Sequence, residues 1–143
     1  MCDLRWVTEY PGLRTFPHKG REAVRVEGSL AVYRLPFPLA PLVLERLIRS
    51  TNRTPTIARE GSWIFLLEED DGLLDPVAAK ELEYAQAYRE AEGVCLILPR
   101  LVREPDHAPW WVCPPDCGRL MCPVGEFVST TREVWRLRTL GRR

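Results

Sequence analysis

The first half of the chain alternates apolar and polar positions in a way that predicts a strand followed by a helix. Val, Tyr and Leu are dense at 29–35, and the prolines that follow end this predicted strand. In LVLERLIRS, which follows Pro41, the residues Leu44, Leu47 and Ile48 recur at i, i+3 and i+4 among charged residues. This spacing predicts an amphipathic helix of about three turns.

The next segment, TPTIAREGSWIFLLEE, predicts a β-hairpin. Its strands are expected at 56–58 and 62–68, joined by a turn at Arg59-Glu60-Gly61. The apolar run WIFLL is unbroken, whereas a half-exposed strand alternates with polar residues. We therefore expect the second strand to be covered on both faces, or to lie in the interior of the sheet.

Asp75 and Pro76 mark the start of a second helix. An aspartate at the N-cap accepts a hydrogen bond from a free N–H group of the first turn, and proline at the first position has no N–H to leave unpaired. Gly93 suits the left-handed residue that ends many helices, so we expect a helix over 76–92. Its predicted apolar stripe consists of Ala78, Leu82, Ala85 and Tyr88.

The last third of the chain predicts two further strands and one helix. Apolar runs place the strands at 94–98 and 110–113. The helix is expected to start at Ser129 or Thr130, either of which can act as its cap, and to stop at Gly141.

The N-terminal segment 1–21 has no sustained period and is expected to be irregular, apart from a short strand near 5–8. The predicted order is therefore strand, helix, hairpin, helix, hairpin, helix. Helices that return between strand pairs favour an α+β fold, or a two-layer α/β fold, with a mixed sheet and about three helices packed on it.

Composition indicates an ordinary globular protein, with 45% hydrophobic and 28% charged residues. A chain of 143 residues can form its own core, so we expect a single domain over 1–143. The formal net charge is zero and no apolar run is long enough to span a bilayer, so we expect no membrane association. Asp3 and Arg5 lie where an export signal would be apolar, and the cysteine count of five is odd. Both observations favour a cytoplasmic location, where thiols stay reduced.

Three of the cysteines gather near a histidine in the segment 107–122. Zinc favours tetrahedral sulfur and imidazole ligands, which His107, Cys113, Cys117 and Cys122 could supply. The spacing lacks a CxxC pair, whose short turn directs two sulfurs at one metal. We therefore favour a Pro-Gly turn with partly buried thiols and no cofactor, and keep a zinc-stabilised module as the alternative.

A cysteine-dependent enzyme is a further alternative. Such an enzyme needs a base beside the thiol, and only His18 and His107 are available. Cys95 lies in an apolar strand, where a thiol is expected to be inert. The acidic run at the end of WIFLL could hold a divalent metal through Glu69 and Asp71, but a solvated acidic loop is the favoured interpretation.

Charge is strongly segregated along the chain. Between 60 and 92 there are ten acidic and two basic residues, a net of minus eight, and from 129 onward five arginines face one glutamate, a net of plus four. The candidate binding residues of this basic end are Arg132, Trp135, Arg136, Arg142 and Arg143. The arginines of this set could contact phosphates or an acidic face of a partner protein, or they could fold back on the chain's own acidic middle. For the tryptophan we favour packing in the protein's own core.

Four segments that together cover about residues 35 to 120 are LPFPLAPLVLERL, RTPTIAREGSWIFLL, EGVCLILPR and WWVCPPDCGRL. These segments resemble small proteins related to the N-terminal domain of bifunctional DNA primase/polymerases. The resemblance implies a mixed α/β domain with hairpins. An active domain of that family would carry two acids alternating with apolar residues on a strand, and a Ser-x-His element. Glu69 and Asp71 lie instead in an acidic run, and neither His18 nor His107 follows such a serine.

The resemblance therefore implies a related scaffold without polymerase chemistry. Together with the absence of a complete catalytic constellation, it predicts a non-catalytic interaction or regulatory module, linked to a nucleic-acid or transcription process. We expect a protein partner, and nucleic acid is the alternative.

Overall fold

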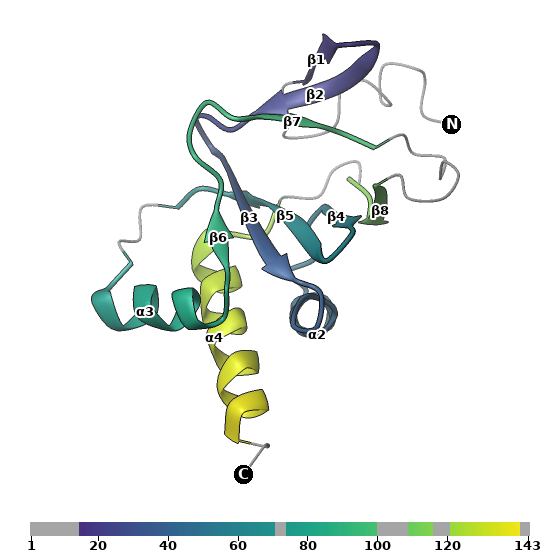
Figure 1. The fold of residues 1–143 in the computed structure, drawn as a ribbon. Helices are drawn as coiled ribbons and strands as arrows, with labels where there is room; N and C mark the ends of the chain where they lie inside the picture. Colours follow the sequence, from purple (N-terminus) through teal and green to yellow (C-terminus); the bar gives the residue numbers. More distant parts are fainter. Residues whose placement is uncertain (1–14, 71–73, 100–108, 116–120, 141–143) are drawn as a thin grey trace.

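The computed structural model describes residues 15–70, 74–99, 109–115 and 121–140, and it confirms the α+β class (Figure 1). Within these residues, eight strands form two antiparallel sheets, and three helices pack on the larger sheet. In chain order the elements are β1 (Thr15–His18), β2 (Arg21–Arg25), β3 (Leu30–Pro36), α2 (Ala40–Arg49), β4 (Thr56–Arg59), β5 (Ser62–Glu68), α3 (Pro76–Tyr84), β6 (Tyr88–Arg89), β7 (Cys95–Ile97), β8 (Trp110–Cys113) and α4 (Val124–Leu140).

The strands pair differently from the single mixed sheet that the sequence indicated. The five-stranded sheet has the order β6-β3-β5-β4-β8, and the three-stranded sheet has the order β1-β2-β7. The second predicted hairpin does not form, because β7 pairs with β2 and β8 pairs with β4. In the first of these pairs Leu96 lies opposite Val24, so both apolar side chains enter the same core.

Strand β5 lies at the centre of the larger sheet and confirms the prediction made from WIFLL. Phe65 and Leu67 point into the core beneath the helices, whereas Ile64 and Leu66 point into a second core shared with the three-stranded sheet. All four side chains are fully buried. Because successive strand residues face opposite sides, this unbroken apolar run covers both faces of the sheet.

The helix α2 forms where it was predicted, but its apolar stripe is shifted. Ala40, Val43, Leu44 and Leu47 are buried against the sheet. This is a full i, i+3, i+4, i+7 stripe, so Ile48 falls at its edge and is exposed. The prediction that Ile48 belongs to the buried face was therefore wrong.

The cap of α3 is confirmed, but the predicted end is wrong. The Asp75 carboxylate accepts a hydrogen bond from Ala78 N at 2.8 Å, as an N-cap should. The helix ends at Tyr84 rather than at residue 92, because Gln86 adopts a left-handed φ of 59° and the chain leaves to pair β6 with β3. Tyr88 consequently lies on an exposed edge strand instead of the helix stripe.

Three further features differ from the prediction. Segment 1–21 is not irregular throughout, because β1 and β2 form a hairpin whose turn has Lys19 and Gly20 at positive φ. In β7 the side chain of Cys95 is exposed rather than enclosed in an apolar strand. The helix α4 begins at Val124, ahead of the predicted cap residues. The strand predicted near 5–8 lies outside the described residues.

Candidate functional site

The two described arginines that were predicted to bind a partner contact a glutamate of the chain's own acidic middle. Arg132 donates to Glu81 Oε1 on α3 from Nε at 3.2 Å and from Nη2 at 2.8 Å. Arg136 donates from Nε to Glu81 Oε2 at 2.6 Å. These contacts match the fold-back alternative for Arg132 and Arg136. Arg142 and Arg143 lie outside the described residues.

Glu81 is the centre of this contact between α3 and α4. Its side chain is only 12% exposed, so it is enclosed by the two guanidinium groups. The hydrogen bonds from Arg136 and Arg132 lower the pKa of Glu81 from 4.5 to about 2. The carboxylate therefore stays ionised at all ordinary pH values and joins the two helices.

Trp135 lies on α4 between these two arginines and is half buried. It packs against the core under the helices, and its ring stacks on Tyr84 of α3 with centroids 6.1 Å apart and an interplanar angle of 15°. This position agrees with packing in the protein's own core, the interpretation favoured from the sequence. The ring, like the arginines, holds α3 against α4.

Two of the four candidate zinc ligands are described, and both are buried. Cys113 ends β8, and Cys122 precedes α4. Both side chains belong to the core under the helices. Arg53 Nε donates to Cys113 Sγ at 3.1 Å, and the adjacent Thr54 accepts a hydrogen bond from Cys122 N at 3.3 Å. His107 and Cys117 lie outside the described residues.

The thiol of Cys122 is strongly disfavoured as a thiolate. Burial, reinforced by the negative charge of Glu126, raises its pKa from 9.0 to about 12. Its Sγ donates to the Pro123 carbonyl at 3.3 Å. A thiol in this state is a weak nucleophile, because the thiolate is the reactive form. Within the described residues, no three His, Cys, Asp or Glu side chains gather as a potential metal site.

Two carboxylates of the acidic run that follows β5 have structural partners. Glu69 forms an ion pair with Arg89 of β6. Asp70 Oδ2 accepts a hydrogen bond from Gly125 N at 2.7 Å and so caps the N-terminus of α4. This distant cap explains why α4 starts ahead of the predicted residues. Asp71, the other residue of the predicted acidic pair, lies outside the described residues.

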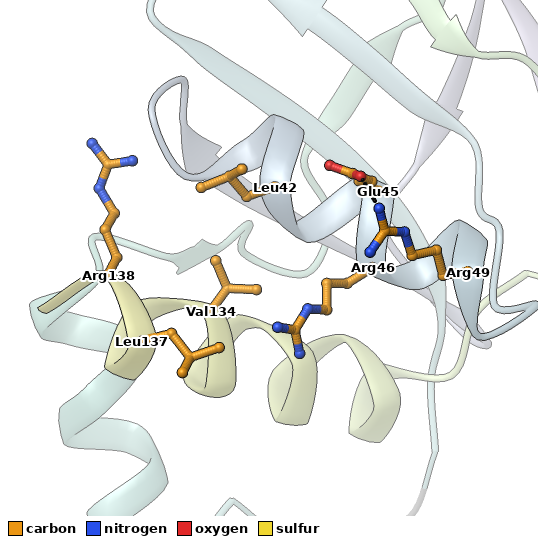
Figure 2. Close-up of a pocket in the computed structure, with 7 residues that line it drawn as sticks. All are labelled: Leu42, Glu45, Arg46, Arg49, Val134, Leu137 and Arg138. Carbon is orange, nitrogen blue, oxygen red and sulfur yellow. Dashed lines mark hydrogen bonds and ion pairs between the residues drawn. The ribbon is translucent and has the colours of Figure 1, made fainter. Parts of the chain in front are cut away.

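The sequence did not reveal a groove between α2 and α4, which has a volume of about 330 Å³ (Figure 2). Its lining residues are Leu42, Glu45, Arg46, Arg49, Val134, Leu137 and Arg138. The side chains of Leu42, Val134 and Leu137 form its apolar middle. Leu42 and Leu137 lie outside the buried stripes of α2 and α4.

Comparisons with known proteins identify no relative. No protein-family model matches the chain, and neither a curated protein nor a solved structure is significantly similar to it. The resemblance to primase/polymerase domains therefore stays a prediction. None of the helices in the described residues has both the length and the apolar character to cross a membrane.

Proposed function

We propose that this chain is a non-catalytic protein-binding module and that it contacts its partner through the groove between α2 and α4. The observation that carries the proposal is the apolar middle of this groove. Leu42 is 40% exposed and Leu137 is 52% exposed, although both belong to helices that have completed their buried stripes. Apolar side chains that gather in a concave surface commonly mark a binding site.

Exposed apolar side chains on the helical layer are not confined to the groove. Of the eleven large apolar side chains that are exposed in the described residues, six lie on the three helices. They are Leu42 and Ile48 on α2, Val77 and Tyr84 on α3, and Leu137 and Leu140 on α4. A single exposed leucine needs no explanation, but Leu42 and Leu137 meet in one concave surface, which favours a docking site there.

The arginines of α4 support protein binding over nucleic-acid binding. Arg132 and Arg136 already contact Glu81, so a phosphate would have to displace an internal ion pair. A link to a nucleic-acid or transcription process could then run through the partner. We also propose a cytoplasmic location, because Cys95, Cys113 and Cys122 are free thiols.

Site-specific photocrosslinking in the native cell tests the proposal. A photoreactive amino acid at position 137, inside the groove, should capture a protein, and the same group at Lys19, in the β1–β2 turn, should not. The Leu42→Asp variant should abolish capture from position 137, because a buried charge opposes apolar docking. The Val77→Asp variant places the same charge on an exposed helical position outside the groove and should preserve capture.

Three outcomes would contradict the proposal. They are equal capture from position 137 and Lys19, capture that Leu42→Asp does not reduce, and crosslinks to nucleic acid alone. Circular dichroism of Leu42→Asp must match that of the unmodified protein. We expect the two spectra to agree, because Leu42 is exposed and its replacement should leave the fold intact.

A further inference from the structure

The groove between α2 and α4 has basic groups at both ends of its apolar middle. Arg138 lies at one end, and Arg46 and Arg49 lie at the other, with Leu42 between them (Figure 2). The lining contains three arginines and one glutamate, a net charge of plus two. An occupant that places acidic groups beside both ends would therefore be attracted to this surface.

The internal partners of these arginines leave part of this charge available. Arg49 pairs with Glu45 at 2.7 Å, but both side chains are well exposed, and exposed pairs of this kind are weak. Arg46 pairs with Glu133 of α4. Arg138 donates at 3.3 Å to the carbonyl of Pro38, which is an uncharged acceptor. A carboxylate could thus reach Arg138 without displacing another carboxylate.

The walls of the groove favour a helical occupant. Leu42, Val134 and Leu137 all lie within α2 or α4, where backbone N–H and C=O groups are already paired along the helix. An extended peptide would find no strand edge here to pair with, whereas an amphipathic helix needs only side-chain contacts. The apolar middle also disfavours nucleic acid, since phosphates gain nothing from contact with leucine and valine.

We propose that the groove binds an amphipathic helix of a protein partner, with apolar residues at helical spacing that enter the middle and acidic residues that contact Arg138 at one end and Arg46 or Arg49 at the other. This inference rests on the proposed protein-binding function and specifies the chemistry of the partner. The ion pairs supply orientation and specificity, and burial of the apolar side chains supplies most of the attraction.

A displayed library of random 16-residue peptides tests this inference and requires no assumption about which protein is the partner. The library is selected on the whole protein and counter-selected on the Leu42→Asp/Leu137→Asp double variant. We expect the enriched peptides to carry apolar residues at i, i+3 or i+4 and i+7, flanked by Asp or Glu. No enrichment, or enrichment of Lys- and Arg-rich peptides, would overturn the inference.

Charge reversal on both sides then tests the role of Arg138. Fluorescence anisotropy compares one enriched peptide with a copy in which its flanking Glu residues are replaced by Lys. The acidic peptide should bind at least about tenfold more tightly. Arg138→Glu should weaken the acidic peptide by about threefold to tenfold and strengthen the lysine copy. Equal effects of Arg138→Glu on both peptides would refute the assigned contact.

Two further measurements test whether the occupant of the groove is a helix of another protein. Sedimentation of the protein alone would overturn the inference if it showed a dimer that Leu42→Asp dissociates, because a second copy would then fill the groove. Preferred binding of duplex DNA over the acidic peptide, lost in the double variant, would overturn it too.

The crosslinking and library experiments together separate this inference from the proposed function. If position 137 captures a protein in the cell but no acidic helix is enriched, the inference fails and the proposed function stands. If neither experiment succeeds, both fail.

Discussion

Arg132 of α4 donates two hydrogen bonds to Glu81 of α3 and joins the basic end of the chain to its acidic middle. Arg136 contacts the same carboxylate, so one glutamate receives two guanidinium groups. The charge segregation visible in the sequence therefore serves, at these positions, to attach one helix to another. Its first measurable consequence is a dependence of stability on pH.

Replacement of Glu81 by Gln should destabilise the protein at neutral pH and much less in acid. The pKa of Glu81 is lowered in the folded state from 4.5 to about 2, so the ionised carboxylate stabilises the fold. This contribution is fully present above the unfolded value of 4.5 and is lost as the pH falls toward 2. Urea unfolding at a series of pH values should show the difference between the two proteins shrink across that interval.

Glu83→Gln provides the matched control. Glu83 lies on the same helix and is exposed, and its replacement removes the same charge. Its difference from the unmodified protein should be small throughout the pH series, because an exposed charge contributes little to stability. A Glu81→Gln protein whose stability deficit is the same at pH 7 and in acid would show that ionisation of Glu81 adds nothing to its contact with Arg132 and Arg136.

Trp135→Ala should lower the free energy of unfolding by about 2 kcal/mol, because a half-buried ring loses its packing and its stack on Tyr84. Leu140→Ala on the same helix is the comparison, since Leu140 is 58% exposed and should change the free energy by less than about 0.5 kcal/mol. Both values come from urea unfolding. An unchanged free energy for Trp135→Ala would contradict the core position and would favour a surface anchor for a partner.

The features that could be predicted from the sequence are those determined by local contacts. Asp75 caps a helix by accepting a hydrogen bond from the N–H group of Ala78, three residues later in the chain. Gly61 adopts the positive φ that the tight hairpin turn requires. The unbroken apolar run that includes Phe65 also predicted burial on both faces of the strand. Successive strand residues point to opposite faces, so a few consecutive residues show the character of each face. Such features do not depend on the rest of the fold.

The features that were missed depend on residues that are distant in the chain. The end of α3 is determined by pairing of β6 with β3, and the start of α4 is determined by the carboxylate of Asp70. The groove depends in the same way on Leu42 and Leu137, which come together only when α2 packs beside α4. No local pattern contains that information. The attachment of Arg132 to acidic residues was foreseeable as charge attraction, but its particular partner was not.

Zinc analysis of the purified protein tests the alternative site formed by His107, Cys113, Cys117 and Cys122. We expect less than about a tenth of an equivalent in protein purified without added metal, and an unchanged melting temperature in chelator. The reason is that the spacing lacks a CxxC pair, whose short turn directs two sulfurs at one metal. Close to one equivalent of zinc, with lower melting temperature in chelator and a loss of zinc in Cys122→Ser, would establish the metal site instead.

Thiol labelling should distinguish the exposed cysteine of β7 from the buried one before α4. Cys95 is exposed, so Cys95→Ser should remove one rapidly reacting thiol per chain from a labelling assay at pH 8. Cys122 is buried and burial raises its pKa to about 12, so at that pH it stays a protonated thiol and reacts slowly.

Cys122→Ser should therefore leave the rapid phase of the native protein unchanged and should remove one thiol only after unfolding in urea, where burial no longer raises the pKa. The two serine variants control for each other, because each removes one sulfur and adds one hydroxyl. Loss of a rapidly reacting thiol in Cys122→Ser would show that this cysteine is accessible and ionised in the native fold. Position 122 would then be a reactive centre, and the cysteine-dependent alternative would be favoured over simple packing.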